Sequence, residues 1–559
     1  MALELLPNEI LLECFQYLNT LDIFHSFDGL NNRFYKLIRN ISLQLDLQYI
    51  SNTKFVHFCT KTLSDPKVKQ QIYSLKLSNK IVHNQIQLFF SLHSLNEFSQ
   101  LRSLTLIKLK QNDEEKLITM LPFICQLHCF QVIDSNIETK QLLTVLPMSK
   151  LKRLAASSLP FDLMPIYGSI IDLRLSHTSW NEVYQIFKYL RLLKYLHIEE
   201  FTDSQSLSLD SPIEIYPAIH LKKLVITKFY YSFNKFQTFV KFTPNIKTLD
   251  LNTYDRNDFF DADRWVKLIT ASLPDLTIFK FKFFSSYRIG EYNILDRLKQ
   301  FRTDFWYKQH HWYTEYVAYM SSILIYTIPY TSDTYIVKPN IERYYNHLRT
   351  NTNVFDNVIN LTLHQNKIND RNLNYFSNVV SLKLEYFFLQ LNNIEQLKIV
   401  VNLSNVQHLT ISDTCQIQDT YSFLRILQEM PQLLSLAIQI NYILTFFNDD
   451  ILCNYLNNKI KKLDINGYPY YTLKDSTELI RFGEIFSNVE QITCYYEQLT
   501  DISCIINYLS KLSCIKVIIP IHFSLTFVSA LLKGGTDNMK IAVHIEHDNT
   551  FNTLIYLNR

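Results

Sequence analysis

The feature that most constrains this 559-residue chain is a six-residue phrase, L-x-x-L-x-L, with Ile, Val or Phe substituting at some leucine positions. In a stretch that reads x-L-x-L, the period-two alternation places the leucines on one face of a strand and the intervening residues on the other. Each copy therefore predicts one strand with a buried face and a polar face. The sixteen copies begin at residues 72, 101, 127, 151, 170, 193, 221, 246, 276, 358, 379, 406, 433, 460, 489 and 512.

The segments between the copies have helical periodicity, as in residues 112–123, 261–275 and 422–432. Proline cannot continue a helix, so a proline shortly before a copy predicts where the helix ends. Prolines in this position are Pro122, Pro147, Pro244, Pro274 and Pro431. The repeating unit is therefore a strand, a turn and a helix.

Apart from one gap, successive copies lie 19 to 30 residues apart, which matches the period of leucine-rich repeats. The chain resembles the leucine-rich-repeat family over roughly residues 70–547. One unit cannot bury its own apolar face, whereas a stack of units can. We therefore expect an α/β fold, a leucine-rich-repeat solenoid with a concave parallel sheet and convex helices.

The N-terminal stretch LELLPNEILLECFQYLNTLDIF (residues 3–24) predicts a short helix that begins near Pro7. At about 100° per residue, apolar side chains form one continuous arc. The arc comprises Tyr17, Ile10, Cys14, Leu18, Leu11, Phe15 and Leu12. It covers about 220°, whereas a one-sided surface helix needs little more than about 100°. The surplus predicts a second partner, inside or outside the chain.

This segment resembles an F-box. The resemblance rests on Leu6-Pro7, Glu9-Ile10-Leu11, Phe15, Leu18, Asp22 and a closing Leu30, Phe34 and Leu37. F-box modules are small and helical, and they dock on the Skp adaptor of a cullin–RING ubiquitin ligase. The resemblance implies that adaptor contacts are made by Leu6, Pro7, Ile10, Leu11, Leu12, Phe15 and Leu18. The family's late Cys-basic-x-Trp motif is replaced here by LNNRF (residues 30–34). Alternatively, this helix only caps the first repeat, because solenoids need capped ends.

The copies that begin at 276 and 358 are 82 residues apart, about three repeat lengths. The interval contains an aromatic-rich stretch at 304–330, interpreted as a β-rich insertion or distorted repeats. Exposed aromatic side chains anchor protein interfaces, so Trp306, Trp312 and Tyr313 are candidate substrate contacts. His310 and His311 are adjacent, so on a strand they point to opposite faces and do not form a metal site. The expected organisation is an F-box module at 1–45, a linker or capping helix at 46–70, repeats at 71–284, the insertion at 285–357, and repeats with a C-terminal cap at 358–559.

Leucine-rich repeats usually bind partners along the concave sheet, through the residues between the leucines. In the first block, the candidates for substrate binding are Arg174, His197, Lys223, Asp250 and Lys280. Neither charge sign dominates along this surface, so no steering of a strongly charged partner is predicted.

Composition restricts the function further. The net charge is +3 without a basic run, which gives no broad electrostatic case for nucleic acid. The nine cysteines include no CxxC pair and indicate reduced thiols in an intracellular protein. With seven glycines, the chain contains no GxGxxG or GxxxxGK[ST] phosphate loop. The first fifteen residues carry three glutamates, unlike a signal peptide, and the longest apolar stretches are too short to span a bilayer.

These observations lead to one hypothesis and two rivals. We expect a non-catalytic substrate-recognition subunit of a Skp–cullin–F-box ubiquitin ligase, located in the cytoplasm or nucleus. It binds the Skp adaptor, and through it a cullin, and it recognises an unidentified protein substrate. No cofactor, metal, nucleic acid or membrane is expected. One rival is a leucine-rich-repeat scaffold or inhibitor without a ligase link. The other is an enzyme, which catalytic turnover or stoichiometric metal would support.

Overall fold

The computed structural model forms two compact units, Met1–Trp312 and Tyr313–Arg559. It describes residues 3–48, 50, 52–80, 84–135, 137–202, 216–286, 299–319, 322–337, 342–345, 354–364, 375–466, 476–495, 509, 511–520, 542–547 and 552–558. Within these residues the protein is α/β, and most of its strands belong to large, mainly parallel sheets.

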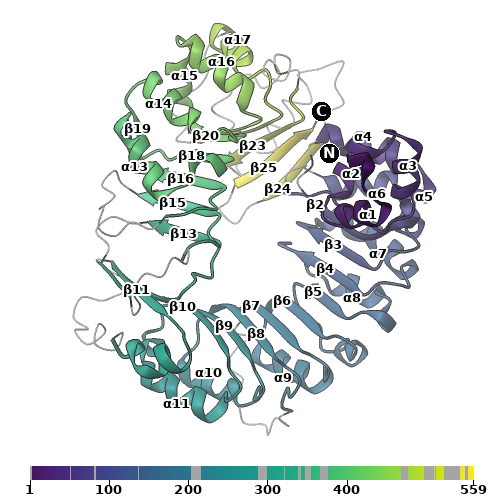
Figure 1. Ribbon diagram of the computed structural model, residues 1–559, viewed down its shortest axis with the longest axis vertical. Helices are drawn as coiled ribbons and strands as arrows, with labels where there is room; N and C mark the ends of the chain where they lie inside the picture. The colour runs from purple at the N-terminus through teal and green to yellow at the C-terminus, as the bar shows by residue number, and fades with distance from the viewer. Residues whose placement is uncertain are drawn as a thin grey trace. The chain divides into compact units, whose positions relative to one another are not determined.

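In unit 1, every strand pairs in parallel with the next strand along the chain (Figure 1). The strands are β1 (Leu43–Asp46), β2 (Ile72–Ser78), β3 (Ser103–Ile107), β4 (Cys129–Ile133), β5 (Arg153–Ala156), β6 (Asp172–Thr178), β7 (Tyr195–Phe201), β8 (Lys223–Phe229), β9 (Thr248–Tyr254) and β10 (Ile278–Ser286). The nine L-x-x-L-x-L copies of the first block each coincide with one strand, β2 to β10, as predicted.

The second leucine position of the phrase forms a buried row across the sheet of unit 1. The register pairs in turn Leu75, Leu104, Phe130, Leu154, Leu173, Leu196, Leu224, Leu249 and Phe279. Each of these side chains is at most 2% exposed. Fully burying one apolar side chain of this size contributes about 1.5–3 kcal/mol, so the row is a major source of stability.

From α4 onward the helices of unit 1 connect successive strands, and α7 to α11 lie along one face of the sheet (Figure 1). The opposite face carries the residues between the leucines, and we call it the polar face. The helices are α1 (Asn8–Gln16), α2 (Thr20–Phe27), α3 (Asn32–Ile38), α4 (Asn52–His57), α5 (Pro66–Gln71), α6 (Gln85–Leu92), α7 (Gln111–Met120), α8 (Lys140–Val145), α9 (Trp180–Tyr189), α10 (Phe233–Val240) and α11 (Ala262–Ser272). The expected helix stops are confirmed, since α7, α8, α10 and α11 each end within four residues of Pro122, Pro147, Pro244 or Pro274.

Helices α1 to α3 form a small module beside β1. Its core includes Phe15, Phe27 and Phe34, whose ring centroids lie 5.2 to 6.4 Å apart. Arg33 fixes the preceding turn, since its guanidinium donates to the Glu4 carbonyl at 2.6 Å, the Leu6 carbonyl at 2.5 Å and Asn8 Oδ1 at 2.8 Å. Arg33 therefore links the start of α3 to the turn that precedes α1.

The N-terminus of α2 covers the free edge of β1. The Thr20 hydroxyl donates to the Gln44 carbonyl at 2.5 Å, and Asn19 Nδ2 donates to the Asp46 carbonyl at 3.3 Å. An uncovered edge strand exposes unpaired backbone groups that can pair with another chain. These two bonds satisfy such groups, so α2 acts as an end cap for the sheet of unit 1.

Unit 2 contains a second parallel series that ends in an antiparallel hairpin. Its strands pair in the order β13-β15-β16-β18-β20-β21-β22-β23-β25-β24. They are β13 (Thr334–Val337), β15 (Asn360–His364), β16 (Ser381–Glu385), β18 (His408–Ile411), β20 (Ser435–Gln439), β21 (Lys462–Asn466), β22 (Gln491–Tyr495), β23 (Cys514–Pro520), β24 (Ala542–His547) and β25 (Asn552–Asn558). The seven copies of the second block coincide with β15, β16, β18 and β20 to β23, as predicted.

Other elements in the described part of unit 2 include three short strand pairings and five α-helices. Strand β11 (Thr314–Tyr319) pairs antiparallel with β12 (Ser322–Thr327) and β14 (Glu342–Tyr345), and β17 (Phe388–Leu389) pairs with β19 (Gln416–Ile417). The helices are α13 (Asn392–Val400), α14 (Thr420–Gln428), α15 (Ile440–Phe446), α16 (Asp450–Lys459) and α17 (Ser476–Ile485).

The parallel strands extend beyond the boundaries expected from the phrase. Strand β1 precedes the expected start at 71 and overlaps the end of the segment assigned to an all-α module at 1–45. Strand β13 lies within the expected insertion at 285–357 and pairs in parallel with β15. Neither strand carries a full L-x-x-L-x-L phrase, because its first position is Asn40 before β1 and Ser332 before β13. Residues 287–298, 338–341, 346–353 and 521–541 of the expected insertion and C-terminal block lie outside the described residues.

Candidate functional site

Helix α1 presents apolar side chains to solvent along one side. Ile10 is 43% exposed, Tyr17 84% and Leu18 41%, and Cys14 is also exposed. Ile10 and Cys14 are one turn apart on α1, and Tyr17 and Leu18 directly follow its C-terminus. We call Ile10, Cys14, Tyr17 and Leu18 the α1 face. An exposed apolar cluster of this kind is typical of protein–protein interaction sites.

The expected adaptor-binding residues divide into two groups in the structure. Leu11 and Phe15 are 0% and 3% exposed, because they pack into the core of the α1–α3 module. The expectation that these two side chains are available to a partner is therefore wrong. Pro7, Ile10 and Leu18 are exposed, and Leu6 and Leu12 are partly exposed.

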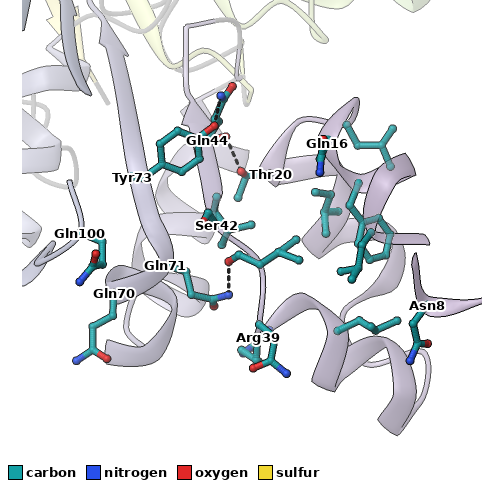
Figure 2. Close-up of a pocket in the computed structure, with 18 of the residues that line it drawn as sticks. Asn8, Gln16, Thr20, Arg39, Ser42, Gln44, Gln70, Gln71, Tyr73 and Gln100 are labelled. Carbon is teal, nitrogen blue, oxygen red and sulfur yellow. Dashed lines mark hydrogen bonds between the residues drawn. The ribbon is translucent and has the colours of Figure 1, made fainter. Parts of the chain in front are cut away.

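A groove of about 1120 Å³ lies between the α1–α3 module and the first strands of the sheet (Figure 2). Its lining is rich in amides and includes Gln16, Gln44, Gln70, Gln71 and Gln100. It also contains the hydrophobic residues Leu12, Phe15 and Leu18 and the cations Arg39 and Arg102. The groove can therefore donate and accept hydrogen bonds and contact apolar side chains.

The structure brings the five charged and polar candidates of unit 1 together on the polar face of β6 to β10. The strand register aligns Arg174 with His197, His197 with Val225, Val225 with Asp250, and Asp250 with Lys280. Lys223 lies two residues before Val225 and is aligned with Tyr195. This juxtaposition follows from the repeat, because the same position of each phrase occupies the same place on its strand.

Tyr195 forms the centre of this group and was not predicted. Arg174 Cζ lies 5.1 Å from the centroid of its ring, and Lys223 Nζ also lies 5.1 Å from that centroid. Both distances are within the range of a cation–π interaction. Arg174 Nε also contacts Asp172 Oδ1 at 3.4 Å. The copy LKYLHI (193–198) places Tyr195 on the polar face, so its position was readable from the sequence, but its two cationic neighbours depend on the adjacent strands.

Burial and neighbouring charges shift the pKa values of His197 and Asp250 on this face. Burial, together with Arg174 and Lys223, lowers the pKa of His197 to about 4, and Asp172 opposes the shift. His197 is therefore neutral near pH 7, and its Nε2 lies 2.9 Å from the Thr227 hydroxyl. Burial also raises the pKa of Asp250, although Lys280 and Lys223 act in the opposite direction.

The expectation that Trp306 and Trp312 are exposed interface anchors is wrong. Trp306 is 0% exposed and Trp312 is 6% exposed, and Tyr313 is partly exposed. Trp306 packs on Phe301 at a ring-centroid distance of 4.7 Å, and Trp312 Nε1 donates to the Thr277 carbonyl at 3.2 Å. These tryptophans cover the apolar face of β10, the last parallel strand of unit 1. The aromatic-rich stretch at 304–330 begins with a π-helical turn at Phe305–Gln309 rather than with the expected strand.

Among the described residues, no three histidine, cysteine or acidic side chains come together in a way that could hold a metal ion. His310 stacks on Trp312 with ring centroids 4.2 Å apart. Burial raises the pKa of the Cys59 thiol to about 12, so this cysteine stays protonated near neutral pH. None of the helices in the described part of the chain has the length and hydrophobicity that crossing a membrane requires.

The chain matches neither a model of a known protein family nor any curated protein.

Proposed function

We propose that this protein is a substrate-recognition subunit of a Skp–cullin–F-box ubiquitin ligase. In this proposal, the α1–α3 module docks on the Skp adaptor through the α1 face. The parallel strands form leucine-rich-repeat solenoids, and their polar face holds a target protein. The observation that carries the proposal is that the α1 face stays exposed while α2 of the same module packs on the sheet.

The capping alternative accounts for only part of this arrangement. It predicts that the apolar arc of residues 6–18 is buried against the first repeat. Thr20, Ile23 and Phe24 of α2 are buried and perform the capping. Ile10 and Tyr17 remain exposed, so covering the sheet edge does not require them. The exposed part of the arc therefore favours a second partner outside the chain.

The proposed mechanism involves no catalysis by this chain. The ligase holds a target lysine near the ubiquitin carrier, which raises the effective concentration of the two reactants. The amide-rich groove beside α1 and the polar face of β6 to β10 provide hydrogen bonds and charges that suit protein recognition. This role places the protein where cullin ligases act, in the cytoplasm or nucleus.

The proposal is tested by copurification of the intact chain with the Skp adaptor. The variant carries Ile10→Asp and Tyr17→Asp, because both side chains are exposed and their loss leaves the module core intact. Leu11 is unsuitable, since a charge at a fully buried position unfolds the module. A matched control carries Phe123→Asp and Ile166→Asp, which are 67% and 57% exposed elsewhere in unit 1.

We expect the intact chain and the control to copurify with the adaptor and the α1-face variant to lose it. Circular dichroism should show the same secondary structure for all three proteins. Failure of the folded intact chain to bind the adaptor would contradict the proposal. That result would favour a leucine-rich-repeat scaffold or inhibitor in which the module serves as a cap.

A further inference from the structure

Charged side chains on the polar face of unit 1 differ in whether they have an ionic partner. Most of them are paired: Lys76 with Asp46 at 3.1 Å, Lys228 with Glu199 and Glu200 at 3.5 and 3.3 Å, and Arg174 with Asp172 at 3.4 Å. Arg153, Lys223 and Lys280, in contrast, form no ion pair with any residue that the structure describes. The net charge of the polar face does not show which cations are paired, because it counts paired and unpaired residues alike.

The unpaired cations lie on β5, β8 and β10 of the same sheet face. The register aligns Arg153 with Asp172, Asp172 with Tyr195, and Tyr195 with Lys223. Lys280 lies in the adjacent row, opposite Asp250. Neighbouring strands are about 4.8 Å apart, so the group spans about 24 Å from β5 to β10. We call Arg153, Arg174, Lys223 and Lys280 the basic strip; it contains four cations, against the two carboxylates Asp172 and Asp250.

The neighbours of the basic strip indicate an excess of positive charge at this part of the polar face. Arg174 and Lys223 both contact the Tyr195 ring, which orients the two side chains. Arg174 is also paired with Asp172, whereas Lys223 forms no ion pair with any described residue. Both cations also act to lower the pKa of His197, so the positive potential reaches a neighbouring buried group. Asn252, two residues after Asp250 on the same face, has a buried Oδ1 without a hydrogen-bond partner. The Asn252 Oδ1 atom beside the strip is therefore a hydrogen-bond acceptor without a partner among the described residues.

An aromatic cluster lies on the same face at the carboxyl ends of β8 to β10. The Tyr230 and Tyr254 rings have centroids 5.9 Å apart, and the Tyr254 and Phe284 rings have centroids 6.5 Å apart. Tyr230 is 41% exposed. Tyr254 follows Asp250 by four residues, so the cluster lies about 13 Å along the strand from the basic strip.

We propose that the basic strip and the aromatic cluster together bind an extended acidic segment of the target protein. Acidic side chains of the segment contact Arg153, Lys223 and Lys280, and an apolar side chain about four residues away packs on Tyr230 and Tyr254. This inference rests on the proposed function, because it specifies the substrate class of the same surface. Charge complementarity of this kind mainly determines specificity and association rate.

The test measures binding of three fluorescein-labelled peptides to the intact chain by fluorescence anisotropy. The acidic probe carries four Asp and Glu residues followed four positions later by Phe. The basic probe has Lys at the four acidic positions, and the phosphorylated probe has phosphoserine at two of them. The variant carries Lys223→Glu and Lys280→Glu. The matched control carries Lys241→Glu and Lys267→Glu, which makes the same charge change at exposed positions on the helical side.

We expect the acidic probe to bind at least tenfold more tightly than the basic probe. The basic-strip variant should weaken this binding more than tenfold, and the control should change it less than twofold. Tighter binding of the phosphorylated probe identifies phosphate as the source of the negative charge, whereas equal binding shows that carboxylates suffice. The inference is overturned if the acidic probe binds no better than the basic one, or if both variants weaken binding equally. Tighter binding of a ten-nucleotide RNA would also overturn it, in favour of nucleic acid.

Copurification with the Skp adaptor separates this inference from the proposed function. The Lys223 and Lys280 substitutions lie far along the sheet from α1, so they should leave adaptor binding unchanged. Loss of acidic-peptide binding with adaptor binding intact assigns the effect to the basic strip alone. Peptide binding without adaptor binding would retain the acidic-segment site and refute the ligase role.

Discussion

The bond between Thr20 and the Gln44 carbonyl leads to a quantitative prediction about the end cap of unit 1. Thr20 is 1% exposed, and its hydroxyl donates to the outer edge of β1 at 2.5 Å (Figure 2). Thr20→Val keeps the shape of the side chain and removes only the donor. Asn19 still caps α2, because its Oδ1 accepts from the Leu21 amide at 3.2 Å. The substitution therefore isolates one contact between the α1–α3 module and the sheet.

The expected cost follows from the carbonyl that is left without its donor. Losing a partly buried hydrogen bond costs about 0.5–1.5 kcal/mol net. Because 1.4 kcal/mol corresponds to a factor of ten, local opening of β1 should become roughly 2- to 12-fold more frequent. Hydrogen exchange followed by mass spectrometry measures this opening as faster exchange of amides in residues 43–47, and amides of β9 should not change.

Thr20→Ser serves as the control, since it retains the hydroxyl and should keep most of the protection at β1. Equal acceleration in the Val and Ser variants would mean that methyl packing, rather than the hydrogen bond, holds α2 on the edge strand. Unchanged exchange in the Val variant would refute the reasoning that α2 caps the sheet through this bond.

Three further predictions concern the module, the aromatic end of unit 1 and the polar face. Arg33→Met removes three hydrogen bonds to residues 4–8, so limited proteolysis should cut this turn faster, whereas far-ultraviolet circular dichroism should hardly change. Trp306→Ala should destabilise unit 1 by about 3–5 kcal/mol, seen as a lower melting temperature, whereas Tyr307→Ala, at a 40% exposed position, should cost less than about 0.5 kcal/mol. NMR titration should find His197 neutral down to about pH 4, and Lys223→Ala should raise its pKa; a pKa near 6.5 would contradict the burial described here.

The lowered pKa of His197 makes the free energy of unfolding depend on pH. Its pKa is about 4 in the folded protein, below the ordinary value of 6.5. Between these values the unfolded chain binds more protons than the folded chain, so stability falls as the pH decreases from about 6.5 to 4. His197→Gln should reduce this part of the pH dependence in thermal unfolding curves.

Strands, their order and their register were predictable from the sequence because the information is local and repeated. Each L-x-x-L-x-L phrase specifies a buried face by its period, and sixteen copies become sixteen strands in the structure. Equivalent positions then align automatically, which is why Arg174, His197 and Asp250 lie on neighbouring strands. The prolines that end helices are equally local signals. The end strands β1 and β13 were missed because polar residues, Asn40 and Ser332, occupy the first position of the phrase.

Only the tertiary structure decided which side chains remain available to a partner. Leu11 and Ile10 are adjacent apolar residues of one helix, yet only Leu11 is buried by its neighbours. Trp306 is buried because β10 needs a cover for its apolar face, a requirement that arises only once the strands are stacked. Pairing among charges likewise depends on the adjacent strand, and so Lys228 is paired with Glu199 and Glu200 whereas Lys223 forms no ion pair among the described residues. Periodicity determines the face on which a side chain lies, but its exposure and its ionic partners depend on residues distant in sequence.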